Sequence, residues 1–300
     1  MFTDQTIREF VRAPMPSTRR VAPDLRFSVV MPSFNHARFI ERSLNSVLNQ
    51  EYESTELIVM DGGSADGTGD ILERYSPHLA VWRSEKDKGQ SDALNKGFAC
   101  ATGEIYGWLN SDDLYLPGAM RYAADVFAAY PHIQVVYGDW LSIDLADQVI
   151  ERHPALAPSR GRLVTEGFFC NAQAMFWRRS LHERLGEFDG ELHYTMDYDL
   201  MLRMISVAGA GAFFRTDRPL GCFRVYPGQK TGSITDQVPQ EHRRIAARQG
   251  TSWKYTLRGE ALRAFYRVTR CAEYLALGRR GHLLKRVRSH LGSSGTNPAS

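Results

Sequence analysis

The sequence predicts an α/β fold in which helices flank a doubly wound sheet over roughly the first 140 residues. Short apolar runs alternate along this part with segments whose apolar residues recur every three or four positions. No internal repeat interrupts the pattern. A chain of 300 residues that is 43% hydrophobic and 24% charged has ordinary globular composition and can build one or two domains.

The expected elements follow one another in the order typical of βαβ units. The first strand ends at Pro32, and the helix after it buries a face that carries Ile40, Leu44 and Val47 at helical spacing. Strands are expected at residues 27–31, 56–60, 79–82, 104–109 and 134–137. Helices are expected at residues 37–49, 66–75, 91–100 and 117–130, and a hairpin around 144–148.

Neither a signal peptide nor a membrane-spanning helix is expected. The segment 1–12 lacks an apolar centre, and the chain has no uninterrupted apolar run of about 18 residues. The four cysteines form no Cys-x-x-Cys pair, which favours free thiols in a reducing compartment and disfavours structural zinc. We therefore expect a cytoplasmic protein.

Charge is distributed unevenly along the chain. Residues 241–300 contain thirteen Lys or Arg and three Glu, a net charge of +10, whereas the rest of the chain carries −7. Aromatic residues are interspersed with arginines between Trp253 and Tyr274, which suggests a helix. Either residues 241–290 dock on an anionic membrane surface at the inner face of the plasma membrane, or they pack on the protein or on a second copy.

Two adjacent carboxylates, Asp112 and Asp113, follow the apolar run 105–109. A strand that ends there delivers hard oxygen ligands to the carboxyl edge of the sheet, where α/β proteins bind their ligands. Such a pair suits a divalent cation that holds a diphosphate. The alternative is an Asp-rich turn before a helix that starts at Pro117, since Asp and Pro favour the beginning of a helix.

The loop after the first strand argues against two common nucleotide-binding classes. It reads Pro-Ser-Phe-Asn at residues 32–35, without the glycine pattern of dinucleotide dehydrogenases or of P-loop NTPases. Two glycines instead follow Asp61 at the end of the second strand. An acid there can accept hydrogen bonds from a base or a ribose, and the glycines let a ligand approach the backbone.

Four segments together resemble family 2 of the inverting glycosyltransferases, in particular bacterial members that build surface polysaccharides. They are residues 30–50 (with Val-Met-Pro-Ser-Phe-Asn), 60–68 (Met-Asp-Gly-Gly-Ser-Ala-Asp-Gly-Thr), 87–97 (Asp-Lys-Gly-Gln-Ser-Asp-Ala-Leu-Asn-Lys-Gly) and 110–113 (Asn-Ser-Asp-Asp). The resemblance covers about residues 27–232. It implies the GT-A fold, a Rossmann-like mixed sheet flanked by helices.

On this basis a GT-A catalytic domain is expected at 27–235, divided into a nucleotide-binding half and an acceptor-binding half. A helical basic C-terminal extension follows it. The expected boundaries are 1–26 for an N-terminal extension, 27–115 and 116–235 for the two halves, 236–290 for the basic extension and 291–300 for a disordered tail.

The resemblance also implies roles for individual residues. Pro32 and Ser33 would line the nucleotide pocket, and Asp61 would hydrogen-bond the base, usually uracil. Asp113 is the first choice as ligand of Mg²⁺ or Mn²⁺, with Asp112 as second ligand nearer the ribose or sugar. The loop that contains Lys88 and Asp92 would face the donor, although a lysine in that position is more often a solvated charge.

The family places its general base at the start of a later helix, and Asp197 falls on this position. The alternative for Asp197 is a helix cap only, and Asp199 lies on a different face of the same helix. Two departures stand out: Met196 replaces a frequent glutamate before the base, and Tyr226 stands where relatives often have histidine. Arg224 or Lys230 could then neutralise the diphosphate instead.

The expected function is transfer of a sugar from a nucleotide-diphosphate sugar, most readily a UDP-sugar, to a saccharide or lipid-linked acceptor with inversion and a divalent metal. No nucleic-acid partner is expected. Two rivals remain: a catalytically inactive glycan-binding or scaffold protein with the same fold, and a sugar-1-phosphate nucleotidyltransferase. The latter should have a glycine-rich basic loop after the first strand, and residues 32–35 do not form one.

Overall fold

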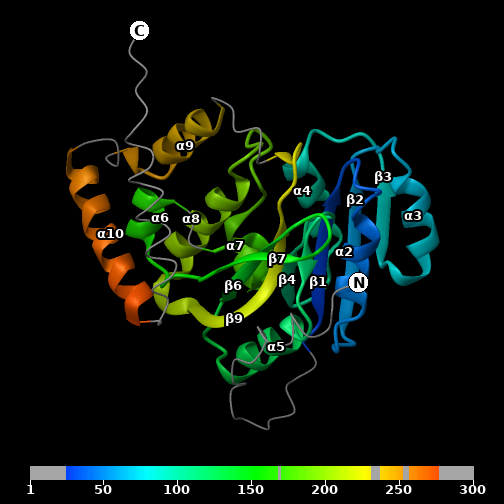
Figure 1. Ribbon diagram of the computed structural model, residues 1–300, viewed down its shortest axis with the longest axis horizontal. Coiled ribbons are helices and arrows are strands. Elements are labelled where there is room, and N and C mark those ends of the chain that lie inside the picture. The colour runs from blue at the N-terminus through cyan, green and yellow to red at the C-terminus, as the bar shows by residue number, and fades with distance from the viewer. Residues whose placement is uncertain (1–24, 168–169, 231–236, 253–256, 277–300) are drawn as a thin grey trace.

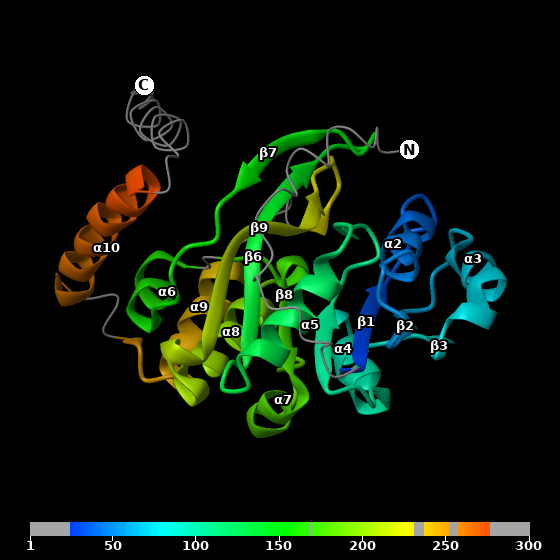
Figure 2. The ribbon, with the colours of Figure 1, turned by 90° about the horizontal axis from the view of Figure 1, so that it is seen from below.

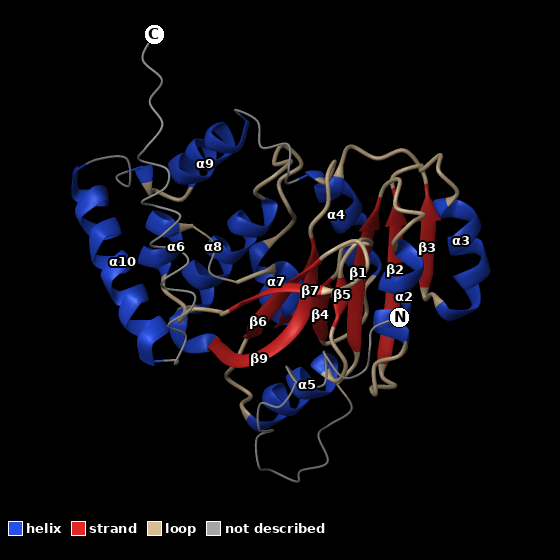
Figure 3. Cartoon of the chain, viewed as in Figure 1, coloured by secondary structure: helices blue, strands red, loops and turns tan. Residues whose placement is uncertain are grey.

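The computed structural model describes residues 25–167, 170–230, 237–252 and 257–276. A single mixed sheet runs through the molecule, with helices on both of its faces (Figure 1 and Figure 3). The strands are β1 Phe27–Ser33, β2 Thr55–Asp61, β3 Val81–Ser84, β4 Ile105–Trp108, β5 Leu114–Tyr115, β6 Val135–Ile143, β7 Val149–His153, β8 Met175–Arg178 and β9 Phe213–Arg224. The helices are α2 Ile40–Leu48, α3 Thr68–Tyr75, α4 Gln90–Cys100, α5 Ala119–Ala129, α6 Arg160–Glu166, α7 Arg179–Leu185, α8 Met196–Ala208, α9 Gln237–Arg248 and α10 Leu257–Ala276.

The strand order is β3-β2-β1-β4-β8-β6-β9-β5, and β7 pairs with β6 as a hairpin. Strands β3, β2, β1 and β4 are parallel, as the βαβ pattern of the sequence predicts. Strand β8 is antiparallel to both β4 and β6, so the sheet becomes mixed in its second half. Consecutive parallel strands place their carboxyl ends at one edge, and this edge carries the loops after β1, β2 and β4.

The core lies on both faces of the sheet because alternate strand residues point to opposite sides. Val29 and Leu57 pack with α2, α3 and α5 on one face, and Val30 and Ile58 pack with α4, α7 and α8 on the other. Helix α4 approaches β1 closely: a Cβ on Gly97 would lie 2.3 Å from Val30 Cγ1. This close packing holds α4 against β1.

The C-terminal helices pack on the part of the protein that contains the sheet. Ile245 and Ala246 of α9 are fully buried, and Ile245 belongs to the core that contains α8. Helix α10 lies against α6, where the Tyr266 hydroxyl is 3.2 Å from Ser159 Oγ. Figure 2 shows α10 at the end of the molecule opposite α3. Within the expected extension 236–290, residues 237–248 and 257–276 are therefore helical, as expected.

Several sequence predictions hold in detail. The hairpin at 144–148 connects β6 to β7, and Cys100, Cys170 and Cys222 are free thiols. Strand β6 continues to Ile143, well past the predicted end at residue 137, because it pairs with β9 along most of its length. No helix within the described ranges is long and apolar enough to cross a membrane. The predicted tail at 291–300 and the extension at 1–26, apart from residues 25 and 26, lie outside the described residues.

Candidate active site

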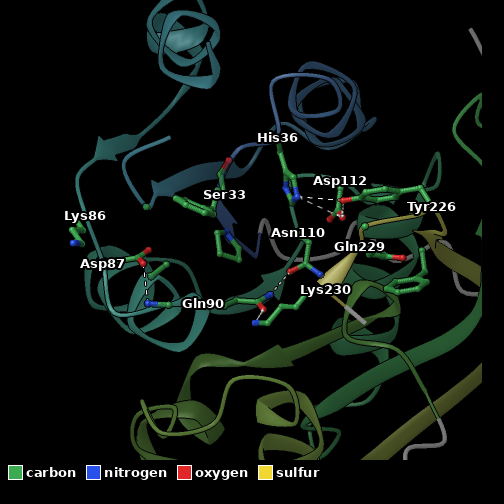
Figure 4. Close-up of a pocket in the computed structure, with 17 residues that line it drawn as sticks. Ser33, His36, Lys86, Asp87, Gln90, Asn110, Asp112, Tyr226, Gln229 and Lys230 are labelled. Carbon is green, nitrogen blue, oxygen red and sulfur yellow. Dashed lines mark hydrogen bonds and ion pairs between the residues drawn. The ribbon is translucent and has the colours of Figure 1, made fainter. Parts of the chain in front are cut away.

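A cavity of about 550 Å³ opens at the carboxyl edge of β1, β2 and β4. Its walls come from the loops after these strands, the beginning of α4 and the loop after β9 (Figure 4). The lining residues are Pro32, Ser33, Phe34, His36, Gly62, Lys86, Asp87, Gly89, Gln90, Ala93, Asn110, Asp112, Phe223, Tyr226, Gly228, Gln229 and Lys230. Four of the five segments that form it belong to the motifs selected from the sequence.

Asp112 presents its carboxylate to this cavity. The Tyr226 hydroxyl donates a hydrogen bond of 2.9 Å to Asp112 Oδ2, and His36 Nε2 lies 3.9 Å from the same oxygen. The other ring nitrogen of His36 is 2.7 Å from Ser111 Oγ, which sets the orientation of the ring. A carboxylate, an imidazole and a phenol from three distant segments therefore meet at one point of the wall.

Asp113 points away from the cavity and is fully buried. Its Oδ1 accepts 2.8 Å from the backbone N–H of Arg224, and its Oδ2 accepts 3.1 Å from Asn110 Nδ2. Burial, together with the neighbouring Asp112 charge, raises the pKa of Asp113 well above its usual range. From the sequence, Asp113 was the first choice of metal ligand and Asp112 the second. In the structure Asp112 lines the cavity and Asp113 does not.

Arg224 supports this corner from behind. The residue is completely buried; its Nε donates 2.8 Å to the backbone oxygen of Asp112, and its guanidinium pairs with Asp147. These contacts hold the Asp112 loop in place. Arg224 itself does not line the cavity. Of the two cations considered from the sequence, only Lys230 lines the cavity.

A chain of polar contacts crosses the floor of the cavity. Lys230 Nζ donates 3.0 Å to Gln90 Oε1, and Gln90 Nε2 donates 2.8 Å to Asn110 Oδ1 (Figure 4). The indole N–H of Trp108 donates to the same Asn110 oxygen at 2.8 Å. Burial lowers the pKa of Lys230, against the influence of nearby acids. These hydrogen bonds link the loop after β9 to the beginning of α4 and the end of β4.

Of the three residues expected to bind the nucleotide, two line the cavity and one does not. Pro32 and Ser33 line the cavity, and the buried Ser33 hydroxyl has no hydrogen-bond partner within the described chain. Asp61 is buried behind Gly62: its carboxylate accepts from the Ser64 backbone and hydroxyl at 2.9 and 2.5 Å and from Ser84 Oγ at 2.6 Å. Asp61 therefore orders the glycine loop and does not itself line the cavity.

Lys88 and Asp92 sit beside the cavity without lining it. Lys88 is exposed, and its backbone N–H donates 3.2 Å to Asp92 Oδ2. Asp92 also pairs with Lys96 one turn later in α4, at 3.2 Å. These contacts favour the alternative of a solvated lysine at position 88 and give Asp92 a role at the beginning of α4.

Asp197 is the second residue of α8 and is partly buried. Burial raises the pKa of its carboxyl to about 6, partly opposed by the Tyr198 N–H and by Lys230. Asp199 differs: its carboxylate pairs with Arg203 at 2.8 Å and with Arg248 at 3.7 Å. Asp197 does not line the cavity, but the preceding loop contacts α4, whose first residue Gln90 does: Ser91 Oγ donates 2.9 Å to the Leu192 oxygen.

His36 and Phe34 had not been singled out for the site from the sequence, and Gln90 entered it only as part of the loop expected to face the donor. His36 and Phe34 belong to the loop that had been selected for Pro32 and Ser33, so their position was a usable signal. His36 lines the cavity. Phe34 lines it too and exposes 58% of its surface, a flat apolar face at the rim.

The model of glycosyl transferase family 2 matches residues 28–185. The chain belongs to this family. A PGL/p-HBAD biosynthesis glycosyltransferase of Mycobacterium tuberculosis is 30% identical over 188 residues, which are 60% of this chain and 70% of that protein. An uncharacterised glycosyltransferase of Nostoc sp. is 31% identical over 131 residues, and this match spans only 41% of each chain.

Solved structures show that this chain has the GT-A fold. S. aureus TarS (residues 1–349) in complex with UDP-GlcNAc superposes with a TM-score of 0.62 at 18% identity, over 78% of this chain and 68% of that chain. The mannosyltransferase PcManGT from Pyrobaculum calidifontis, in complex with GDP-Man and Mn²⁺, gives 0.55 at 18% identity, over 95% and 88%. The predicted family and fold are thus confirmed.

Proposed function

We propose that this protein is an inverting glycosyltransferase that uses a nucleotide-diphosphate sugar, with a UDP-sugar as the first candidate, and a saccharide or lipid-linked acceptor. The observation that carries the proposal is the cavity at the carboxyl edge of β1, β2 and β4, which presents Asp112, Lys230 and the free Ser33 hydroxyl together. Its volume lies in the range of small-molecule sites. The exposed Phe34 ring offers a face on which a base can stack.

The cavity fits a divalent cation that arrives with the donor. Within the described residues no group of three or more His, Cys, Asp or Glu side chains could hold a metal alone. Mg²⁺ and Mn²⁺ accept one or two protein ligands when phosphate oxygens and water complete the set. Asp112 Oδ2 is the carboxylate oxygen that fits this role, and the ion would neutralise charge on the diphosphate leaving group.

The protein itself supplies further stabilisation of the diphosphate. Lys230 and Lys86 line the cavity, and positive charges there act on the negative charge that develops on the leaving group. Lys230 also donates to Gln90 beside Asn110, which holds its charge at the cavity. Arg224 contributes indirectly because it fixes the Asp112 backbone.

We assign the general base to Asp197. A carboxyl group whose pKa is about 6 is mostly ionised at neutral pH and still accepts a proton effectively. As the acceptor oxygen bonds to the anomeric carbon, the bond from that carbon to the diphosphate breaks. The hydroxyl proton passes to Asp197 and the nucleoside diphosphate leaves from the opposite face, which inverts the configuration.

The decisive experiment combines binding and stereochemistry. UDP, GDP and ADP are tested by thermal shift with and without Mn²⁺, since selective binding raises the melting temperature by mass action. We expect stabilisation by one nucleotide and an increase with Mn²⁺. NMR of the transfer product should then show an anomeric configuration opposite to that of the donor. A protein that no nucleotide stabilises would be the inactive scaffold, and release of pyrophosphate would indicate a nucleotidyltransferase.

A further inference from the structure

The Glu241 side chain of α9 makes an unusual set of contacts with a loop distant in sequence. Its Oε1 accepts 2.8 Å from the backbone N–H of His193. Its Oε2 accepts 3.0 Å from the N–H groups of Tyr194 and Thr195 and 2.8 Å from Thr195 Oγ1. One buried carboxylate thus satisfies three consecutive backbone donors and a hydroxyl, all from residues 193–195.

These three residues lead directly into α8, whose second residue is Asp197. Thr195 is the N-cap of α8, yet its side chain makes no capping hydrogen bond to its own helix and donates to Glu241 instead. The other side of the loop is held by α4, where Ser91 Oγ donates to the Leu192 oxygen. The first turn of α8 is therefore held from α4, which borders the cavity, and from α9.

We propose that Glu241 is a positioning residue that holds residues 193–195 and thereby sets the place and environment of Asp197. This inference rests on the proposed function, because it takes Asp197 as the general base. It also gives the basic C-terminal extension a part in the active site: α9 carries the anchor, and its buried Ile245 and Ala246 seat the helix on the domain.

The anchoring carboxylate is ionised at neutral pH. Burial alone would raise the pKa of Glu241, but the donors from His193, Thr195 and Tyr194 outweigh it and lower the pKa. Hydrogen bonds to an ionised acceptor are stronger than those between neutral groups. Removing the acceptor would leave several donors of the loop without a partner, at a cost larger than the value of one bond.

Glu241 also acts on Asp197 through space. Its negative charge raises the pKa of Asp197, whereas Lys230 lowers it. The Cys170 thiol faces the same carboxylate and is neutral, because burial and Asp197 raise its pKa. The nearby Asp199 charge is paired with Arg203 and Arg248. Neutralising Glu241 should therefore lower the pKa of Asp197, an effect that a purely structural contact would not produce.

The test compares Glu241→Gln with Glu191→Gln in the full chain. Both variants remove one carboxylate charge from this region, but Glu191 is exposed and pairs with Arg244 on the outer side. Hydrogen exchange of the amides of residues 193–195 and the Asp197 titration, followed by carboxyl ¹³C NMR, are both independent of turnover. We expect Glu241→Gln to accelerate exchange about tenfold or more and to move the Asp197 titration below that of the wild type.

In activity assays Glu241→Gln should lower kcat about tenfold while the affinity for nucleoside diphosphate stays within about twofold. Should Glu241→Gln fail to fold, Thr195→Val removes one of the four hydrogen bonds and should give a smaller acceleration of exchange. Exchange and titration equal to those of Glu191→Gln would overturn the inference. If the wild type binds no nucleotide, the proposed function fails, and the exchange experiment still decides whether Glu241 anchors the loop.

Discussion

The Tyr226 hydroxyl lies 2.9 Å from Asp112 Oδ2 and 3.4 Å from His36 Nε2. Burial and the adjacent Asp112 charge raise the pKa of Tyr226, so the phenol stays protonated and donates to the carboxylate at neutral pH. A tyrosine in this loop thus orients the carboxylate through a hydrogen bond, whereas a histidine there would offer a nitrogen ligand. The sequence departure at position 226 has a definite structural role.

Tyr226→Phe tests that role. Without the hydroxyl, Asp112 loses the partner that orients it, and partners of metal-binding carboxylates commonly contribute 10–100-fold in metal affinity or activity, so a loss of about this size is expected. Mn²⁺ affinity in the presence of UDP is measured by electron paramagnetic resonance, which reports free Mn²⁺. Tyr130→Phe, at an exposed position away from the cavity, is the control. Equal Mn²⁺ affinity in both variants would contradict the assignment.

Asp112→Asn and Asp113→Asn separate the two adjacent carboxylates. Asp112 faces the cavity, so Asp112→Asn should abolish the Mn²⁺-dependent part of donor binding with little change in melting temperature. Asp113 accepts from Arg224 and Asn110 inside the protein and does not line the cavity, so Asp113→Asn should leave the Mn²⁺ dependence of donor binding in place. Isothermal titration with and without Mn²⁺ and thermal melts measure both. The reverse pattern would restore Asp113 as the ligand expected from the sequence.

This pair also shows how far the sequence carries the prediction. The strand that ends before Asp112 follows from an apolar run, and the structure confirms it as β4, which pairs with β1. Which of two adjacent carboxylates faces the cavity depends on Arg224, which is more than 100 residues away and donates to Asp113 from the end of β9. A local sequence pattern does not predict that contact. The family resemblance supplied the residue types at this corner, and the tertiary contacts supplied their directions.

The second half of the sheet was harder to predict for a related reason. Strand β8 is inserted antiparallel between β4 and β6, and β9 pairs parallel with β6; the sequences of β8 and β9 alone do not reveal these long-range pairings. The net charge of the C-terminal region overstates the positive charge that is available to an anionic partner. Arg244 and Arg248 of α9 form ion pairs with Glu191, Asp189 and Asp199, so acidic residues of the protein itself neutralise part of the +10 charge. The loop contacts of Glu241 had no sequence signal.

Asp197→Asn should reduce turnover and raise stability together. If Asp197 accepts the acceptor proton, the change should lower kcat by on the order of 100-fold or more, with donor affinity nearly unchanged. In the wild type, kcat should rise with pH through about 6 as Asp197 loses its proton. In Asp197→Asn this rise should be absent. A wild-type profile without a rise near this pH would remove Asp197 from the base role.

The stability effect follows from the direction of the pKa shift. The folded protein holds the Asp197 proton more tightly than the unfolded chain, whose carboxyl has the model value of 3.8, so ionisation costs stability as pH rises from about 4 to 6. At pH 7 the cost is complete, at most about 3 kcal/mol for a shift of this size. Asp197→Asn should therefore raise the melting temperature at pH 7. Asp199→Asn is the control with the opposite sign, since it breaks the pairs with Arg203 and Arg248.

Two truncations separate packing from membrane docking in the C-terminal region. Ending the chain at residue 236 removes α9, with its buried Ile245 and Ala246 and the Glu241 anchor, so we expect a destabilised protein. Ending it at residue 252 keeps α9 and removes α10, whose Phe265 and Val268 expose 57% and 69% of their surfaces. The contact of Tyr266 with Ser159 would be lost, but the cavity and Asp197 would stay in place.

Cosedimentation with anionic and neutral vesicles at low and high salt then tests docking. Because Arg244 and Arg248 of α9 are already paired within the protein, vesicle binding should require residues beyond 252 and should weaken as salt screens charges over about 8–10 Å. The chain that ends at 252 should therefore bind UDP with Mn²⁺ as the full chain does, but it should no longer bind anionic vesicles. A full chain that ignores anionic vesicles at low salt would leave α10 as a packing helix on α6. Vesicle binding that survives in the 252 truncation would instead place the docking surface on the catalytic domain.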